Sequence, residues 1–361
     1  QKGITLNEVY KGYEADIKGL KAGDVIIKAG SQSLQNMNKD LLSQILKGAP
    51  NTPLDISILR QDKVIKKTVV TEKIEINPVP FYDLIDLETG YIVLTRFNQK
   101  ASSEVKNAFL DLKKRGMKKL IFDLRNNPGG SLGEAIKISN FFLPKGSKIT
   151  STKAKVRKWS TTYNASNIPL DLEIPLTILI NESSASASEI VAAAIQDYKR
   201  GIIVGQKTFG KGTVQSLQDL SEGAIKVTES KYYRVNGKSV QNKGVRPDIK
   251  MPSTWDIDSV GESSYPSALE WDTIRPYRYT QFKLDPQNLI DLRKEFSKRM
   301  LDDANLSYLQ SVRERYDLNK NKKFLKLFNK SKHANLYTPW PFRRTRNPQN
   351  GQIRSWIKGK R

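Results

Sequence analysis

Hydrophobic positions in the first part of the chain fall into short alternating runs, the pattern of strands that bury one face. The strands predicted from these runs cover residues 25–27, 54–59 and 64–70. Residues 38–47 instead place apolar side chains at helical spacing, and Gly48 stands where a helix would end. We therefore predict a small β-rich module over residues 1–75.

The pattern changes to alternating strands and helices after the proline-containing link at residues 77–80. The predicted strands cover 91–94, 119–123, 176–180 and 202–204, and the predicted helices cover 103–115, 132–142 and 189–198. This alternation indicates a layered α/β domain, which we place at residues 76–252. Beyond it the pattern weakens to one predicted helix over 287–315, within a helical extension at 253–320.

Rare residue types restrict the possible chemistry. The 361 residues include no cysteine, which excludes disulfides, thiolate nucleophiles and cysteine-based metal sites. The single histidine, His333, excludes multi-histidine metal centres and leaves one candidate base for a Ser-His-Asp triad. It lies in the lysine-rich stretch 330–333, where we interpret it as a solvated imidazole. A hydrolase of this composition must activate its nucleophile with another base.

The length predicts two or three domains at roughly 150 residues per domain, and the charge separates one region from them. Of the formal net charge of +24, the segment from Lys320 to Arg361 contributes 13, with no acidic residue, so the rest carries +11. We therefore treat residues 321–361 as a basic tail. No run of 18 apolar residues predicts a membrane span. The chain opens on Gln1 without a start methionine or signal peptide, so we expect a mature or excised piece.

Two segments place small residues between a predicted strand and a predicted helix. Residues 123–130 end in Pro-Gly-Gly, and glycines there expose backbone N–H groups at a helix start, where negative charge is stabilised. The alternative is an ordinary strand-to-helix turn. Residues 181–190 contain four serines, and a serine at a helix N-terminus sits in positive potential. The alternative there is a simple N-cap, although four serines exceed what capping requires.

Residues 205–215 nearly match a phosphate-binding loop, but Gly212 occupies the position where serine or threonine must hold Mg²⁺. No convincing helix follows, so nucleotide binding is disfavoured. A lysine framed by glycines, Lys211, is better explained as a cation in a tight site. Residues 231–249 form a strand, a hairpin turn and a proline-terminated loop by pattern alone.

Together these segments resemble the C-terminal processing, or tail-specific, serine peptidases, over roughly residues 3–320. The motifs that carry the resemblance are Gly19–Asp24, Asn127–Gly130, Ser184–Ile190, Thr208–Gln215, Tyr232–Ile249 and Ala268–Ile274. The family joins a PDZ domain to a crotonase-like layered α/β peptidase core, so we expect an α/β fold with a partial, β-rich PDZ module and a helical C-terminal extension. The early PDZ strands would lie before Gln1, which implies an incomplete peptide groove.

The resemblance implies a Ser–Lys pair, with Ser186 as the nucleophile and Lys211 as its general base. A lysine serves as a base only when its pKa falls toward neutrality, which burial without an acidic partner achieves. Residues 209–214 contain no carboxylate, in agreement with that need. Gln215 matches the family position for a side chain that orients the lysine without charging it.

The resemblance also implies an oxyanion hole made by the N–H groups of Gly130 and Ala187, with no cofactor and no metal. Asp197 aligns with an aspartate implicated in some family members, and on the predicted helix it could equally be structural. Glu189 is interpreted as a helix N-terminal charge rather than a catalytic acid.

The predicted function is a serine endopeptidase that selects proteins by their apolar C-terminal tails. The family resemblance implies the periplasm of the cell envelope as its location, and an adaptor protein is a predicted additional partner. One alternative is a non-catalytic PDZ-type binding protein. Another property is contact with an anionic surface or nucleic acid through the basic tail, where aromatic residues alternate with Lys and Arg, although no specific nucleic acid is expected. The family pattern is lost after about Lys322, through either a lineage-specific basic arm or a reading-frame change.

Overall fold

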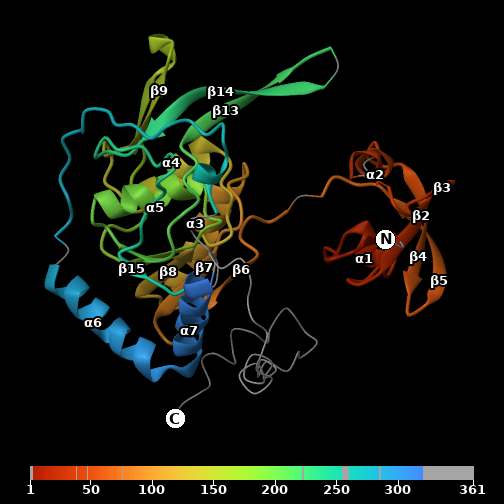
Figure 1. Cartoon of the computed structure of the whole chain (residues 1–361), viewed down its shortest axis with the longest axis horizontal. Helices are drawn as coiled ribbons and strands as arrows, with labels where there is room; N and C mark the ends of the chain where they lie inside the picture. Colours follow the sequence, from red (N-terminus) through yellow and green to blue (C-terminus); the bar gives the residue numbers. More distant parts are fainter. Residues whose placement is uncertain are drawn as a thin grey trace. The chain divides into compact units, whose positions relative to one another are not determined.

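The structure is a computed structural model that describes residues 3–37, 39–46, 48–74, 76–221, 223–253, 260–283 and 286–319. The chain divides into two compact units, Gln1–Ile76 and Asn77–Arg361, which are coloured along the sequence in Figure 1. The predicted basic tail and His333 lie outside the described residues. The predicted boundaries inside the second unit stay predictions.

The first unit is a small antiparallel sheet with two short helices. Its elements are β1 (Ile4–Thr5), α1 (Glu14–Ile17), β2 (Val25–Ala29), β3 (Gln32–Ser33), α2 (Lys39–Leu46), β4 (Pro53–Arg60) and β5 (Lys63–Val70). The strands lie in the order β1-β2-β4-β5, with β3 paired to β2. The predicted helix and three strands of this module are confirmed. The Arg60 guanidinium donates to both carboxylate oxygens of the buried Asp24, which ties the turn at Gly19–Asp24 to β4.

The second unit is built on a six-stranded sheet in the order β15-β12-β11-β8-β7-β6. Its strands are β6 (Phe81–Leu84), β7 (Thr89–Val93), β8 (Lys119–Asp123), β11 (Leu176–Ile180), β12 (Ile202–Gly205) and β15 (Ile249–Lys250). All pairs are parallel except β6 with β7. The predicted strands of the α/β domain are therefore confirmed.

Three helices cover this sheet: the amphipathic α3 (Ala101–Lys114) and α4 (Leu132–Asn140), and α5 (Ala187–Asp197), which is buried along almost its whole length. Helix α4 contacts both α3 and α5, and α5 also contacts β9 of a second sheet, which gives the layered arrangement that the sequence predicts. Side chains such as Val105, Phe109, Ile138 and Val191 are buried in the core between the layers. Alanine dominates the middle of α5, and these small side chains allow the helix to pack closely against the neighbouring layers.

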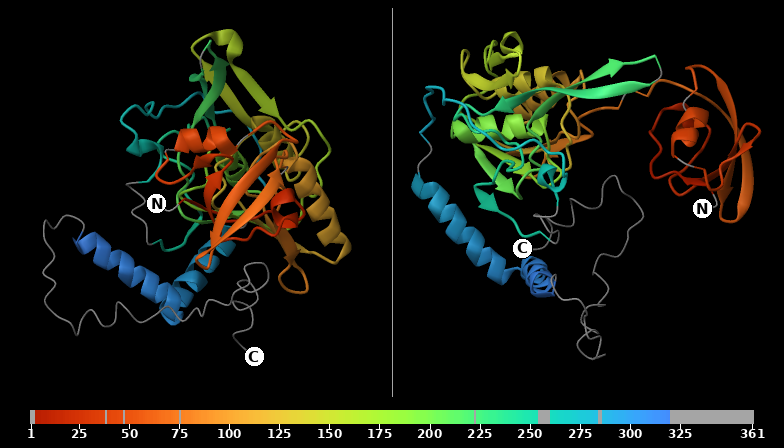
Figure 2. Two further views of the ribbon diagram at one scale, coloured as in Figure 1. Left: turned by 90° about the vertical axis from the view of Figure 1, so that its right-hand side faces the viewer. Right: turned by 45° about the horizontal axis from the view of Figure 1, so that its top comes forward.

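The second sheet is antiparallel and follows the order β10-β9-β14-β13. Its strands are β9 (Lys148–Ala154), β10 (Thr161–Asn164), β13 (Thr213–Asp219) and β14 (Ala224–Tyr233), and short 3-10 helices occur at Arg157–Trp159 and Glu262–Ser264. The β13–β14 hairpin extends far beyond helices α4 and α5, as the green ribbon shows in Figures 1 and 2. Strands β10 and β13 are the two edge strands of this sheet.

The helical stretch predicted over 287–315 is confirmed, but a break that the sequence did not predict divides it into two helices, α6 (Pro286–Asp302) and α7 (Ala304–Asn319). The break is at Asp303, whose carboxylate accepts from the backbone N–H groups of Asn305 and Leu306. An aspartate in this position caps a new helix and competes with continuation of the old one. No helix in the described ranges is long and apolar enough to cross a membrane.

Candidate active site

Two turns meet at the carboxyl edge of the six-stranded sheet. Strands β8 and β11 are parallel neighbours in direct register, so the turns that follow them emerge side by side. The first turn, residues 124–131, leads into α4, and the second, residues 181–186, leads into α5. These are the two small-residue segments that the sequence singles out.

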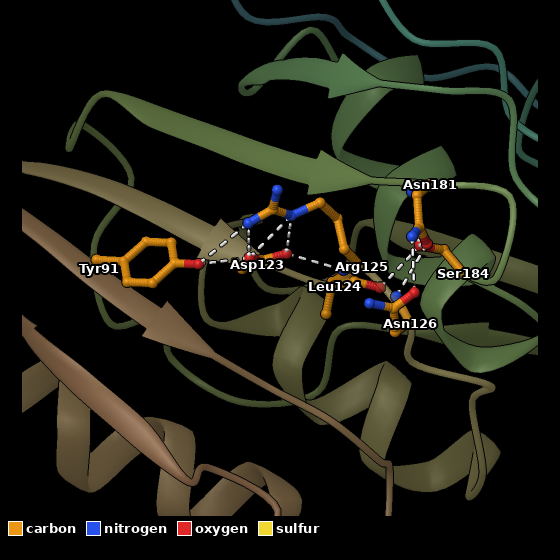
Figure 3. Close-up of polar contacts among 7 residues, drawn as sticks. All are labelled: Tyr91, Asp123, Leu124, Arg125, Asn126, Asn181 and Ser184. Atoms are coloured by element: carbon orange, nitrogen blue, oxygen red, sulfur yellow. Dashed lines mark hydrogen bonds and ion pairs between the residues drawn. The ribbon is translucent and has the colours of Figure 1, made fainter. Parts of the chain in front are cut away.

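Polar side chains fasten the two turns together, as Figure 3 shows. The Ser184 hydroxyl donates to the Leu124 carbonyl oxygen at 2.7 Å. The Asn126 backbone N–H donates to Oδ1 of Asn181 at 2.9 Å, and the Asn181 amide donates to Oδ1 of Asn126 at 2.8 Å. The turns therefore form one rigid unit, because each holds backbone groups of the other.

A second polar cluster fixes the start of the first turn. Asp123 is buried, and its carboxylate accepts from the Arg125 guanidinium at 2.6 Å and from the Tyr91 hydroxyl at 2.5 Å (Figure 3). Burial, with a smaller effect of Asp123, raises the pKa of Tyr91 to about 12. The tyrosine therefore stays a hydrogen-bond donor, and the cluster directs the chain from β8 into the glycine turn.

The glycine turn lies against the serine segment too closely for a side chain. Gly129 has φ +95°, and a Cβ there would lie 2.6 Å from the Ala185 carbonyl oxygen and 2.8 Å from the Ala187 nitrogen. On the other side, Phe97 holds the turn by donating its N–H to Gly129 O and accepting from Ser131 N. Glycine is required at this position because both the conformation and the close approach exclude other residues.

The four serines of residues 181–190 have different environments, and Ser186 is the one that lines the pocket described below. Ser183 is exposed, whereas Ser184 and Ser188 are fully buried and donate to backbone carbonyls of the first turn. Ser186 sits at the N-terminus of α5 with φ +55° and ψ −112°, a conformation that non-glycine residues rarely adopt. Such backbone strain persists where surrounding contacts impose it, and it occurs most often at functional sites.

Glu189 joins the serine segment to the lysine segment. Its side chain is fully buried, and one oxygen accepts from Thr208 Oγ1 at 2.5 Å and Gly210 N at 2.8 Å. The other oxygen accepts from Ser186 N at 2.8 Å and Lys211 N at 2.9 Å. Burial raises the pKa of Glu189 to about 7, and the four donors oppose that shift. The carboxyl group thus sets the spacing between the backbones of Ser186 and Lys211.

Tyr232 makes a second bridge between the same two segments. Its hydroxyl lies 2.8 Å from the Lys211 carbonyl oxygen and 3.1 Å from the Ser186 carbonyl oxygen. The phenol is buried, and burial raises its pKa well above the ordinary value, so it remains a donor. The backbones that carry Ser186 and Lys211 are therefore fixed on two sides.

One pocket of about 500 Å³ collects these groups. Its lining residues are Arg96, Pro128, Gly129, Gly130, Leu132, Ser186, Ala187, Ile190, Lys211, Thr213, Val214, Gln215, Lys226 and Tyr232. No carboxylate belongs to this lining among the described residues. Burial lowers the pKa of Lys211, the positive charge of Lys226 lowers it further, and the negative charges of Glu262 and Glu189 oppose the shift.

Two backbone N–H groups remain available at the pocket. Neither the Gly130 N–H nor the Ala187 N–H donates to an acceptor within the part of the chain that the structure describes. Both residues line the pocket beside Ser186. Ala187 is the first residue of α5, where the N–H groups point out of the helix and the helix dipole favours negative charge.

Three family profiles match consecutive parts of the chain. A PDZ domain matches residues 1–59, peptidase family S41 matches residues 88–251, and the C-terminal domain of tail specific protease matches residues 255–334. Residues 88–251 form a domain of peptidase family S41. The predicted family and fold class, a PDZ module followed by an α/β peptidase domain and C-terminal helices, are thereby confirmed. The last match continues past Lys322, where we expected the family pattern to end.

Curated relatives of this S41 chain occur in staphylococci. It is 34% identical over 249 residues to a Staphylococcus aureus protein named "Probable CtpA-like serine protease", a span that covers 68% of this chain and 49% of the relative. The protein of the same name from Staphylococcus epidermidis is 32% identical over 252 residues, covering 69% of this chain and 50% of the relative. The chain thus spans about half the length of the curated relatives it matches.

Solved structures also resemble the S41 chain. The photosystem II D1 C-terminal processing protease is 28% identical with a TM-score of 0.45, and the likeness covers 69% of this chain and 68% of that one. Mature CPAF complexed with lactacystin is 12% identical with a TM-score of 0.41, and the coverage is 82% of this chain and 80% of that one.

Five of the six site residues predicted for the S41 domain line the same pocket, namely Gly130, Ser186, Ala187, Lys211 and Gln215. Gln215, however, is exposed, and its amide donates to Thr228 Oγ1 at 3.1 Å rather than to the lysine. Its predicted orienting contact with Lys211 is therefore absent among the described residues.

Asp197 is the predicted residue that the structure does not bring to the pocket. It ends α5, about 15 Å along the helix axis from Ala187 at the other end. Its carboxylate accepts from the Arg234 guanidinium and from the Asn236 amide at 2.8 Å. We correct our expectation accordingly: Asp197 lies at the far end of α5 from Ser186, outside the pocket, and is paired with the partly buried Arg234, which favours the structural role.

Sequence reasoning missed the bridging residues Glu189 and Tyr232. Glu189 was interpreted as a helix charge alone, and only its contacts with residues 208–211 reveal the bridge. The Tyr232 motif was recognised, but nothing in its pattern indicates a hydroxyl directed at two carbonyl groups. Within the described residues, no group of three or more acidic or histidine side chains could hold a metal ion.

Proposed function

We propose that this S41 chain is a serine endopeptidase that cleaves proteins selected by their apolar C-terminal tails, through a Ser186–Lys211 dyad and an acyl-enzyme. The observation that supports this most directly is the shared pocket: Ser186, Lys211 and two backbone N–H groups without acceptors lie around it. A nucleophile, a base and an oxyanion site in one cavity are the parts that acyl transfer requires.

The first half-reaction begins with attack of Ser186 Oγ on the carbonyl carbon of the scissile peptide bond, while the Lys211 amine accepts the hydroxyl proton. The N–H groups of Gly130 and Ala187 stabilise the oxyanion of the tetrahedral intermediate. The C–N bond then breaks, and the Lys211 ammonium returns the proton to the leaving amine. An ester between Ser186 and the N-terminal part of the substrate remains.

The second half-reaction hydrolyses this ester. Lys211 removes a proton from water, the hydroxide attacks the ester carbonyl carbon, and the same two N–H groups hold the second oxyanion. Collapse releases the carboxylic acid, and the proton on Lys211 returns to Ser186 Oγ. The lowered pKa of Lys211 favours the neutral amine with which each half-reaction begins.

The surroundings of the pocket support a peptide as substrate. Leu132, Ile190 and Val214 contribute apolar surface next to Ser186, which fits an apolar side chain beside the scissile bond. The PDZ domain supports recognition of protein tails, because such domains bind extended C-terminal peptides at a sheet edge. The adaptor protein and the periplasmic location stay predictions.

The test is covalent labelling of the full chain with a fluorophosphonate probe, together with cleavage of a reporter protein that ends in an apolar tail. We expect the probe to modify Ser186, and we expect Ser186→Ala and Lys211→Ala to reduce labelling and cleavage at least about 10³-fold. Lys211→Ala should keep the unfolding midpoint of the parent chain, because the lysine amine has no hydrogen-bond partner among the described residues. Ser186→Ala also removes the cap that the Ser186 side chain gives to the Glu189 backbone N–H, so it should lower the midpoint slightly.

Matched controls come from the same segments. Ser183 is an exposed serine of the same turn and Lys207 belongs to the same glycine-rich loop, and neither lines the pocket. Ser183→Ala and Lys207→Ala should therefore label and cleave like the parent. If the folded parent chain is not labelled at Ser186, the alternative of a non-catalytic PDZ-type binding protein is favoured instead.

A further inference from the structure

Thr213 is a buried residue of the pocket whose hydroxyl is unpaired. Its side chain is 6% exposed, and Oγ1 has no hydrogen-bond partner among the described residues. The same residue lines the pocket with Ser186 and Lys211. Buried hydroxyls nearly always have a partner, because an unpaired one loses its hydration without compensation. A buried hydroxyl of this kind therefore indicates that another polar group of the same pocket is its hydrogen-bond partner.

Thr213 lies two residues after Lys211 and lines the same pocket. It begins β13, and the pairing with β14 holds the backbone one residue further back, where Tyr232 N donates to Gly212 O at 2.9 Å. The Lys211 amine also has no hydrogen-bond partner among the described residues. Two polar side chains without partners among these residues therefore belong to one pocket and to one short segment.

A lysine that acts as a base needs a neutral hydrogen-bond acceptor for its N–H groups. A neutral amine has two N–H donors and one lone pair, and the lone pair must point at the Ser186 hydroxyl to accept its proton. The N–H groups therefore need acceptors on the other side. A carboxylate acceptor would stabilise the ammonium form, whereas a hydroxyl is a neutral acceptor. Gln215, the expected orienting residue, is committed to Thr228 at the surface.

We propose that Thr213 is the positioning residue for Lys211: its hydroxyl accepts an N–H of the lysine amine and thereby directs the amine lone pair at Ser186. This proposal rests on the proposed Ser186–Lys211 chemistry. Thr213 contacts neither substrate nor reacting atoms in this role, and it acts through the lysine.

The test is Thr213→Val, which removes the hydroxyl and keeps the branched shape. We expect kcat for an apolar-tailed peptide and the rate of fluorophosphonate labelling at Ser186 to fall by about 10–100-fold, with KM changed less than about twofold. The unfolding midpoint should stay the same or rise, because the valine removes an unpaired buried hydroxyl. Thr213→Ser keeps the hydroxyl and should restore most of the rate.

The pH dependence of labelling separates positioning from a structural effect. A hydroxyl acceptor bonds the ammonium more strongly than the amine, so its loss lowers the pKa of Lys211. The rising limb of the labelling rate should therefore move to lower pH in Thr213→Val while the plateau falls. A loosened structure would lower the plateau and the unfolding midpoint together and would leave the limb in place.

Ser139 provides the matched control, since its hydroxyl in α4 is also buried and unpaired among the described residues but lies outside the pocket. Ser139→Ala should label like the parent. Equal labelling of the parent and Thr213→Val would overturn the role of Thr213 and leave the dyad intact. An unlabelled parent chain would instead overturn the proposed function itself, so the two failures are distinguishable.

Discussion

The two ends of helix α5 each bury a carboxylate, but they stabilise it in different ways. At the N-terminal end, Glu189 has no cationic partner among the residues that the structure describes, and it accepts from four neutral donors in two segments. At the C-terminal end, Asp197 pairs with the Arg234 guanidinium. Burial raises the pKa of both groups. Neutral hydrogen bonds therefore stabilise Glu189, whereas an ion pair stabilises Asp197.

The difference matches what each end positions. Glu189 orders the backbones of Ser186 and Lys211, and an arginine beside it would add another charge next to the pocket. Asp197 anchors the turn after β14, where Arg234 and Asn236 converge on it, far from the pocket. The contrast shows that burial of an acid does not by itself identify a catalytic group. The identity of its donors and the segments they belong to decide its role.

Among changes to the two carboxylates of α5, the largest effect on labelling is expected for Glu189→Gln. The amide has one acceptor oxygen instead of two, so two of the four donors lose their acceptor, at about 1–3 kcal/mol each. The Ser186 and Lys211 backbones should separate, and a displacement near 1 Å lowers the rate about 100-fold. Labelling of Ser186 and denaturant unfolding check both effects. Labelling at the parental rate would show that Glu189 does not set the spacing of the dyad.

The stability of the parent chain should also depend on pH through Glu189. Because its pKa is raised from 4.5 to about 7, the folded chain binds a proton between those values that the unfolded chain has lost. The unfolding free energy contributed by this group therefore falls as pH rises from about 4.5 to about 7. In Glu189→Gln that decline should disappear, which unfolding curves at several pH values would measure.

Asp197→Ala should reverse the pattern, with a large cost in stability and none in labelling. It leaves the Arg234 charge buried without its partner, and breaking a buried pair in this way costs about 3–5 kcal/mol. The labelling rate per folded molecule should equal that of the parent, because α5 separates this end from the pocket. A tenfold loss of labelling in folded Asp197→Ala would return Asp197 to the active site.

Matched controls separate charge from packing at this end of α5. Asp197→Asn keeps the size of the side chain and part of its hydrogen bonding, so it should destabilise less than alanine. Replacing Asp197 by leucine and Arg234 by methionine together removes both charges, and the pair of substitutions should recover most of the loss. If the double variant is no more stable than Asp197→Ala, the unpaired charge is not the cause of the cost.

Local sequence patterns predicted four strands and three helices of the α/β core, but not the two outer strands β6 and β15 of its sheet or the β13–β14 hairpin. Strands such as 119–123 and 176–180 are short apolar runs, because they lie in the buried centre of the sheet, and such runs are recognisable in the sequence. The outer part of the hairpin is exposed, and Leu217 and Ile225 stand there among polar residues without a buried face to impose alternation. The helix break at Asp303 was missed because periodicity persists on both sides of it.

The site was predictable only in part, because the residues that organise it act over long sequence separations. The glycine turn and the serine turn carry local signatures, so Gly130 and Ser186 were accessible to prediction. Glu189 and Thr208 are 19 residues apart, and Asp197 and Arg234 are 37 apart. The fold decides these pairs. Thr213 was invisible for another reason, since a missing hydrogen bond has no pattern in a sequence.

The smallest expected effect is that of one neighbouring charge, Lys226, on the pKa of Lys211 near the N-terminal end of α5. Lys226 lines the pocket from β14, and after burial it contributes most to lowering the pKa of Lys211, ahead of the opposing Glu262 and Glu189. Lys226→Met should therefore raise the pKa of Lys211 and move the rising limb of Ser186 labelling to higher pH. Because Lys226 is exposed, the shift should shrink at high salt. Lys153→Met removes an exposed charge outside the pocket and should leave the limb in place. An unchanged limb in Lys226→Met would mean that burial alone sets the pKa of the base.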